Sequence, residues 1–357
     1  MKLFQCQSCN QLVYFENTHC VRCGMALGFL TEIATLSALA ADANGMWQPL
    51  ALPGRSYRSC ANASHGVCNW LVPADSPDPL CQACALNRTI PDLTIATNLE
   101  HWRRIELAKH RVVYAALRLG LPVTPQRDEG DGGLAFDFIA DTSLAFPDAE
   151  PVRTGHDNGL VTLNIVEADD AERERQRQQM AEPYRTLIGH LRHEIGHYYE
   201  QILVVGPERM QRCRELFGDE RMDYAEALER HYRQGPPPDW QARHVSAYAS
   251  SHPWEDFAES WAHYLLIIDA LETASAFGLR IDPAVGDDPA LSTTIDVDPY
   301  RPQPLPALID AWLPLTYAAN ALNRSVGQAD FYPFVLNHEV VAKLDFVHGL
   351  VHGQALT

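Results

Sequence analysis

The sequence contains no long apolar run. Within its 357 residues, apolar stretches such as the one around residues 264–268 are far short of the ~20 residues that a membrane-spanning helix needs. The first residues, Met1 to Cys6, include no apolar run of the kind that forms a signal peptide. We therefore expect no membrane partner and a cytoplasmic location.

Basic residues are also scarce. The sequence has 28 Lys and Arg against 46 Asp and Glu, which gives a formal net charge of −18. Residues 1–95 contain five basic and six acidic residues, so the negative charge belongs almost wholly to the remainder. Because no segment is strongly basic, the chain would repel the phosphate backbone of a nucleic acid. We expect no nucleic-acid partner.

Cysteine, by contrast, is abundant at one end of the chain. Eight of the nine cysteines fall within the first 95 residues. In a reducing compartment, paired cysteines hold metal more often than they form disulfides. The composition, 46% hydrophobic and 21% charged, is that of a globular protein, and the length suits two or three domains. We therefore expect zinc in the N-terminal quarter.

The first four cysteines follow the pattern Cys-x2-Cys-x10-Cys-x2-Cys, with Gly24 after the last of them. Each Cys-x-x-Cys pair can form a tight turn that directs two thiolates to one point, and two such pairs make the closed tetrahedral site of structural Zn²⁺. A redox pair or four unrelated buried thiols are the alternatives. We predict a zinc ribbon over residues 1–50, with the ligands Cys6, Cys9, Cys20 and Cys23.

The second set of cysteines is less regular, because only its last two form a Cys-x-x-Cys pair. We predict a second four-cysteine zinc module over residues 51–95, with His65 as a possible substitute ligand. The predicted ligands are Cys60, Cys68, Cys81 and Cys84. Closed sites of this kind stabilise a fold and present a surface, but they offer no open coordination position and so explain no activity.

Beyond residue 95 the sequence indicates helices separated by short strands. Apolar residues recur at helical spacing in several segments, and other short segments are rich in strand formers. The expected helices cover residues 98–119, 183–204, 254–276, 307–322 and 334–351, and the expected strands cover 134–139 and 160–166. We predict the α+β class, with two zinc modules ahead of a mostly helical catalytic domain, residues 96–357, that carries a small sheet.

Residues 193–197, His-Glu-Ile-Gly-His, match the pattern His-Glu-x-x-His. On a helix, His193 and His197 lie on one face, so both imidazoles can reach one Zn²⁺. Glu194 lies beside them, where it can act as the general base on a zinc-activated water. A chance match is the alternative, but the apolar stripe on the other side of this helix argues against it.

A catalytic zinc generally has three protein ligands and a water. No third histidine follows shortly after His197, which disfavours the metzincin arrangement. Glu255 and Glu259 lie four residues apart on the next strong helix. One of them can bind the metal while the other hydrogen-bonds a ligand imidazole. A charged helix face exposed to water is the alternative.

A His-Glu-x-x-His motif followed some sixty residues later by a helical Glu resembles the gluzincin metallopeptidases. Residues 255–259, Glu-Asp-Phe-Ala-Glu, resemble the zinc-ligand helix of the anthrax lethal factor group. This resemblance implies that Glu255 is the third zinc ligand, and that Tyr248, seven residues earlier, donates a hydrogen bond to the oxyanion. By the same analogy, residues 160–166 would form an edge strand that pairs with extended substrate. A purely structural role is the alternative for Tyr248.

The resemblance extends over nearly the whole chain. The N-terminal zinc ribbon is followed by Cys60-Ala61-Asn62, by residues 68–73, by Gly155-His156-Asp157-Asn158-Gly159 and by Tyr184-Arg185-Thr186. Together these motifs resemble a bacterial family of zinc-binding metallopeptidases with an N-terminal zinc-ribbon domain. The family implies a fold and a class of reaction, but no particular substrate.

These features predict a zinc-dependent peptidase that acts on a peptide or protein. It would hold three zinc ions, two structural and one catalytic. The alternatives are a non-peptide amidohydrolase and a zinc-ribbon interaction or regulatory protein with an inactive metallopeptidase-like domain. Glu194 argues against the second alternative, because a scaffold needs the two histidines but not the base. The zinc ribbons would recruit a protein partner or cover the active site.

Overall fold

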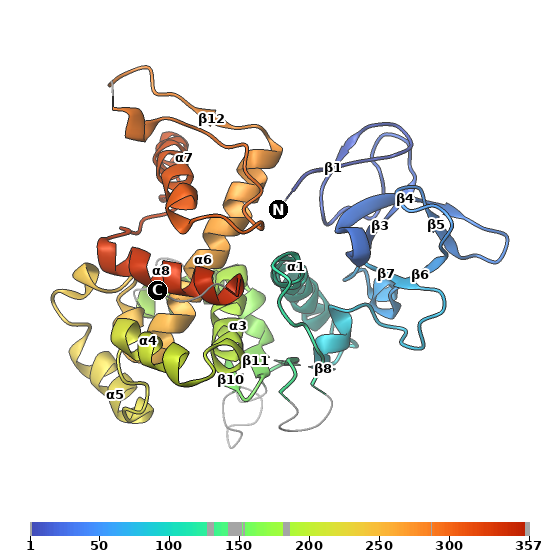
Figure 1. Cartoon of the computed structure of the whole chain (residues 1–357). Helices are drawn as coiled ribbons and strands as arrows, with labels where there is room; N and C mark the ends of the chain where they lie inside the picture. Colours follow the sequence, from blue (N-terminus) through green and yellow to red (C-terminus); the bar gives the residue numbers. More distant parts are fainter. Residues whose placement is uncertain are drawn as a thin grey trace. The chain divides into compact units, whose positions relative to one another are not determined.

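The computed structural model describes residues 2–126, 132–141, 152, 154–180, 186–286 and 288–353, with the backbone alone for 176–180. The chain divides into two compact units, Met1–Arg173 and Glu174–Thr357 (Figure 1). Tyr184 and Arg185, and the helix start predicted near Pro183, lie outside the described residues. Within the described part, no helix is long and apolar enough to cross a membrane.

A five-stranded antiparallel sheet, in the order β3-β4-β5-β6-β7, lies in the first unit. Its strands are β3 (Ala26–Leu30), β4 (Thr35–Ala41), β5 (Trp47–Pro49), β6 (Tyr57–Ser59) and β7 (Leu71–Pro73), and a hairpin of β1 (Phe4–Gln5) and β2 (Leu12–Val13) precedes them. The sequence did not predict this sheet. In β3 and in β4, four consecutive residues are buried. These strands therefore lack the regular alternation of buried and exposed residues by which a strand is predicted from sequence. The predicted boundary between the two zinc modules, at residue 50, falls directly after β5. The division into two modules stays a prediction.

A second, mixed sheet of the first unit has the order β10-β11-β9-β8. Its strands are β8 (Asn87–Thr89), β9 (Ala135–Ile139), β10 (Gly155–Asp157) and β11 (Leu160–Asn164). The two strands predicted in this region are therefore confirmed as β9 and β11. The expectation that residues 160–166 form an edge strand is wrong, because β11 pairs with β10 on one side and with β9 on the other. The strand at that edge is β10.

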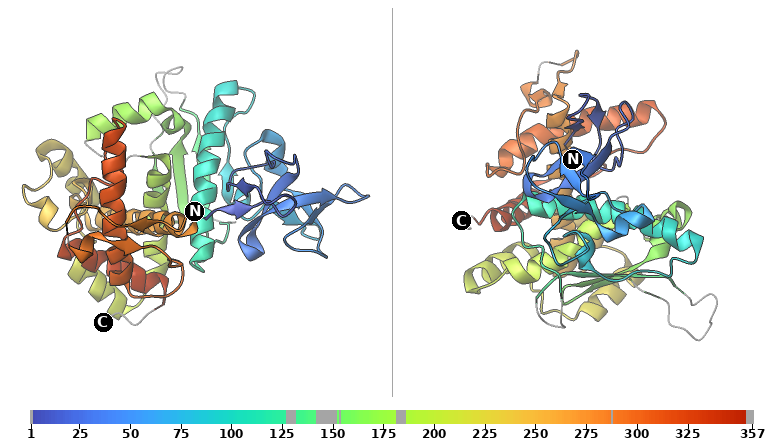
Figure 2. Two further views of the ribbon diagram at one scale, coloured as in Figure 1. Left: turned by 90° about the horizontal axis from the view of Figure 1, so that it is seen from above. Right: turned by 90° about the vertical axis from the view of Figure 1, so that its right-hand side faces the viewer.

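Helix α1 (Ala96–Arg118) is the long helix of the first unit and lies between its two sheets (Figure 2). Toward the five-stranded sheet, the ring of Tyr114 contacts the rings of Phe15 and Phe29. Toward the mixed sheet, the Nζ of Lys109 lies over the rings of Phe136 and Phe138. The helix predicted from residue 98 is thus confirmed, and it provides core contacts to both sheets.

The second unit consists mainly of helices. These are α3 (Leu187–Leu203), α4 (Pro207–Phe217), α5 (Tyr224–Gln234), α6 (Pro253–Ala276), α7 (Leu305–Ser325) and α8 (His338–Val351), with a short hairpin of β12 (Arg280–Ile281) and β13 (Thr293–Thr294), and α2 (Asp170–Met180) lies at the division between the units. The four helices predicted for this unit are present. Helices α4 and α5 were not predicted, because their sequences are rich in charge and bury few residues.

Helices α3 and α6 lie side by side in the second unit (Figure 1). At Gly196, a Cβ atom would lie 3.0 Å from the Cα of Ala258 and 3.2 Å from the Cβ of Trp261, so a glycine permits the close approach of the two helices. Tyr199 stacks on Trp261 with ring centroids 4.8 Å apart. The protein is of the mixed α+β class, as predicted, and α3 and α6 carry the three predicted ligands of the catalytic zinc, His193, His197 and Glu255.

Candidate metal centres

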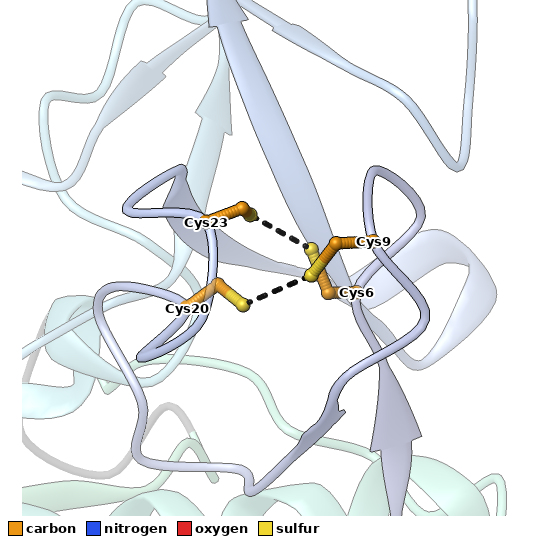
Figure 3. A group of neighbouring side chains, drawn as sticks. All are labelled: Cys6, Cys9, Cys20 and Cys23. Carbon is orange, nitrogen blue, oxygen red and sulfur yellow. Dashed lines mark hydrogen bonds between the residues drawn. The ribbon is translucent and has the colours of Figure 1, made fainter.

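The first four cysteines converge on one point (Figure 3). The Sγ atoms of Cys6 and Cys23 are 3.7 Å apart, and those of Cys9 and Cys20 are 3.6 Å apart. All four Sγ atoms lie within 4.8 Å of one another. A tetrahedral zinc ion with Zn–S bonds of ~2.3 Å separates its sulfur ligands by about 3.8 Å. The spacing of these sulfur atoms therefore fits a zinc ion.

The backbone explains this convergence. Asn10 and Gly24, each directly after a Cys-x-x-Cys pair, have φ angles of 61° and 76°, a left-handed conformation that favours Gly and Asn. Their amides donate to the carbonyl oxygens of Cys6 and Cys20, each at 2.9 Å. The two closed turns hold each pair of thiols on the same side of the loop.

The second set of four cysteines also forms a compact cluster, and all four residues are buried. The Sγ atoms of Cys68 and Cys81 are 3.6 Å apart, and backbone amides donate to the sulfur atoms of Cys60 and Cys68 at 3.3 Å. This cluster fits a zinc ion in the same way as the first. His65, considered as a substitute ligand, instead contacts the ring of Trp102.

Two buried side chains of α1 adjoin this second cluster. The Nε2 of His110 lies 3.8 Å from the Sγ of Cys84, and the Oε2 of Glu106 lies 4.0 Å from it. The Nδ1 of His110 donates to the carbonyl oxygen of Glu106 at 2.6 Å, and Lys109 pairs with the Glu106 carboxylate. These contacts connect the predicted zinc ligands to α1. No sequence motif indicates them, because 26 residues separate Cys84 from His110.

The third candidate metal centre consists of His193 and His197 on α3 and Glu255 on α6. The Oε2 of Glu255 lies 2.9 Å from the Nε2 of His193 and 3.7 Å from the Nε2 of His197. A tetrahedral zinc ion with bonds of ~2.0–2.1 Å separates such ligand atoms by about 3.4 Å. Two imidazoles and a carboxylate are also a donor set that zinc binds. The residues at this point therefore fit a zinc ion.

His193 lies between two carboxylates. Its Nε2 donates to Glu255, and its Nδ1 donates to the Oε1 of Glu259 at 2.8 Å. Burial lowers the pKa of His193, but the hydrogen bonds and charges of these two carboxylates raise it well above its ordinary value. The Oε2 of Glu259 in turn accepts a hydrogen bond from Ser246 at 2.6 Å. A metal ion can replace the proton on Nε2 while the Nδ1 contact continues to orient the ring.

The other oxygen of Glu255 is also held in place. Its Oε1 accepts a hydrogen bond of 2.6 Å from the hydroxyl of Tyr224 on α5. Burial opposes ionisation of Glu255, but the His193 hydrogen bond, the nearby His197 and the Tyr224 hydroxyl lower its pKa to about 2. Glu255 is therefore an anion at neutral pH, with Oε2 directed toward the two histidines.

Glu194 is buried one residue after His193 and has a specific partner. The Nε2 of His190 donates to the Oε1 of Glu194 at 3.0 Å, from one helical turn earlier. Burial raises the pKa of Glu194, but the hydrogen bond and charge of His190 lower it below its ordinary value. This carboxylate is thus ionised at neutral pH and can accept a proton.

Tyr248, in the short 3₁₀ helix Tyr248–Ser250, lies beside the same group of residues. Its ring centroid is 5.9 Å from that of His193 and 6.1 Å from that of His231 on α5. The structure therefore brings together all the residues predicted for the catalytic centre: His193, Glu194, His197, Tyr248, Glu255 and Glu259.

Three partners of these residues were not predicted: His190, Tyr224 and Ser246. The contact of His190 could have been predicted, because His190 lies four residues before Glu194 on the same helix. The two histidines of the motif have the same spacing. Tyr224 and Ser246 had none, since they lie 31 and 13 residues from the glutamates they contact.

The comparisons with known proteins identify the family. Residues 98–350 match the family model described as putative zinc-binding metallo-peptidase, and residues 3–95 match a zinc-ribbon domain. Uncharacterized protein Mb2598c of Mycobacterium bovis and Uncharacterized protein Rv2568c of Mycobacterium tuberculosis are each 42% identical over 352 residues, which cover 98% of this chain and 95% of theirs. No solved structure matches the chain significantly. The chain therefore belongs to the family of putative zinc-binding metallo-peptidases and carries a zinc-ribbon domain over residues 3–95.

Proposed function

We propose that this protein is a zinc-dependent peptidase of the gluzincin type. Family membership supports a peptidase, and the observation that carries the proposal is the convergence of His193, His197 and Glu255, with Glu194 on the same helix. In this proposal the first three residues hold the catalytic zinc. The zinc, when bound, polarises the scissile carbonyl and activates a water molecule.

Glu194 acts as the general base and then as the proton carrier. Its ionised carboxylate takes a proton from the attacking water and delivers it to the amine that leaves when the peptide bond breaks. The hydrogen bond from His190 to Oε1 fixes the carboxylate, so that Oε2 is the oxygen that accepts the proton. His190 is thus a positioning residue.

The remaining side chains orient the ligands and stabilise charge. Glu259, itself held by Ser246, fixes the ring of His193 so that Nε2 is the ligand atom. The Tyr224 hydroxyl donates a hydrogen bond to the Oε1 of Glu255, so that Oε2 is the oxygen that binds the metal. Tyr248 donates a hydrogen bond to the oxyanion of the tetrahedral intermediate.

The two cysteine clusters hold two further, structural zinc ions, which gives three zinc ions per chain. The domain layout proposed with them is a zinc ribbon over residues 1–50, a second zinc module over 51–95 and the catalytic domain over 96–357. Because four thiolates leave no position open for a substrate, the cysteine sites stabilise the fold and take no part in hydrolysis.

Cleavage of a proteome-derived peptide library tests the proposal. We expect the zinc-loaded protein to generate new amino termini, detected by mass spectrometry, and we expect a chelator that removes only the most exchangeable zinc to stop their appearance. Zinc added back to the chelator-treated protein should restore cleavage. If the zinc-loaded protein hydrolyses non-peptide amides but no peptide, the substrate class is wrong, and if it hydrolyses neither, the proposed function is wrong.

Substitution of His190 tests its positioning role. We expect His190→Leu to lower kcat about tenfold or more, with KM and zinc content unchanged, because Glu194 loses the donor that fixes it. We expect His190→Gln, whose amide nitrogen can replace Nε2 as the donor, to recover most of that loss. Equal kcat values for the two variants, measured on one peptide, would remove His190 from the mechanism.

A further inference from the structure

Three large side chains are exposed close to the catalytic metal centre of the second unit. Met222 is 46% exposed, Trp254 41% and Tyr224 36%. The ring of Tyr224 lies 5.7 Å from that of Trp254 and 5.2 Å from that of His252, and His252 and Trp254 are 5.1 Å apart. The exposed rings of Tyr224 and Trp254 pack on the buried ring of His252, and the exposed Met222 lies two residues before Tyr224. These four residues are called here the aromatic patch (Met222, Tyr224, His252 and Trp254).

The local backbone holds the aromatic patch in position. His252 is buried and caps the N-terminus of α6, where its Nδ1 accepts a hydrogen bond from the amide of Trp254 at 3.1 Å. Its Nε2 donates to the carbonyl oxygen of Met222 at 3.2 Å. The segment before α5 and the first turn of α6 are therefore joined through one side chain. A surface fixed in this way loses little conformational entropy when a ligand binds.

The aromatic patch is continuous with the metal centre through Tyr224. Its ring lies beside those of His252 and Trp254, while its hydroxyl donates to the Oε1 of Glu255 at 2.6 Å. The other oxygen of Glu255 faces His193 and His197. Tyr224 therefore connects the aromatic patch to the carboxylate that faces both histidines.

We infer that the aromatic patch is a subsite for a large apolar or aromatic side chain next to the scissile bond. The inference rests on the proposed peptidase function and specifies its substrate class. A large apolar side chain that packs on the rings of Tyr224 and Trp254 or on the thioether of Met222 removes apolar surface from water. An aromatic side chain gains further from ring–ring contacts. The carboxylates of Glu194 and Glu255 nearby disfavour an acidic side chain at this position.

A set of peptides that differ at one residue beside the scissile bond, Phe, Ala, Arg or Glu, provides the test. We expect kcat/KM to be at least tenfold higher for Phe than for Ala, and we expect Trp254→Ala to remove most of that ratio. Trp254→Phe should keep the ratio. Phe277→Ala, which removes another exposed aromatic ring (52%) at the opposite end of α6, is the matched control and should change nothing.

Direct binding of the same peptides to the zinc-loaded protein separates this inference from the proposed function. Tighter binding of the Phe peptide that is lost in Trp254→Ala supports the subsite even if no peptide is cleaved, in which case the peptidase proposal alone fails. Cleavage with equal preference for Phe and Ala, or with a preference for Arg, overturns the subsite. A change of oligomeric state in Trp254→Ala, measured by light scattering, also overturns it, because the patch would then be an interface between copies.

Discussion

Replacement of Glu194 by Gln is expected to lower peptide hydrolysis at least about 10³-fold while all three zinc ions are retained. A positioned general base contributes roughly 10²–10⁴-fold to a rate, and an amide cannot take up the proton. Gln keeps the size of Glu, and its Oε1 can still accept the hydrogen bond from His190. We therefore expect the buried surroundings of this residue to persist.

Glu200 on the same helix is the matched control for this substitution. Burial, with the negative charges of Glu220 and Glu255, raises the pKa of Glu200 well above its ordinary value, which favours the protonated carboxyl, the form that Gln resembles. We expect Glu200→Gln to leave kcat/KM within about twofold. Zinc content by mass spectrometry and kcat/KM on one peptide are the measurements. Cleavage by Glu194→Gln at the wild-type rate would show that the base is another group.

The candidate catalytic residues were predicted from the sequence partly by helical geometry and partly by the family resemblance, which selected Glu255 as the third ligand and pointed to Tyr248. His193 and His197 are four residues apart, as are Glu255 and Glu259, so each pair shares a helix face before anything is known of the fold. The structure adds what spacing cannot supply: the pairing of α3 with α6, which Gly196 permits, and the separation of the two glutamates onto opposite nitrogens of the His193 ring.

The parts that could not be predicted depend on contacts between distant segments. The five-stranded sheet has strands buried on consecutive residues, which conceals the period of two. Tyr224 and Ser246 reach the two glutamates from segments without any motif, and His110 reaches Cys84 from a different element. Tyr224 and His110 contact the predicted metal ligands Glu255 and Cys84, and Ser246 contacts Glu259, which hydrogen-bonds a ligand. Sequence patterns thus indicated the candidate metal ligands, and the structure showed which side chains contact and orient them.

Substitution of Glu255 by Ala is expected to reduce the zinc content from three ions per chain to two. The Oε2 of Glu255 is the only carboxylate oxygen among the described residues that groups with both histidines as a candidate metal ligand, so its removal leaves two imidazoles to hold the ion. We expect the zinc affinity of this site to fall more than 100-fold, beyond the 10–100-fold range of a lost hydrogen-bond partner. The zinc ions in the two cysteine clusters serve as an internal standard in the same sample.

Substitution of Glu259 distinguishes a metal ligand from a residue that only hydrogen-bonds a ligand. Because its Oε1 accepts from the Nδ1 of His193, on the far side of the ring from Glu255, Glu259→Ala should weaken zinc binding only about 10–100-fold. Glu259→Gln retains an acceptor oxygen and should bind zinc nearly as tightly as the wild type. Competition with a fluorescent chelator measures all three variants. If Glu259→Ala releases the zinc while Glu255→Ala keeps it, the roles assigned to the two glutamates are exchanged.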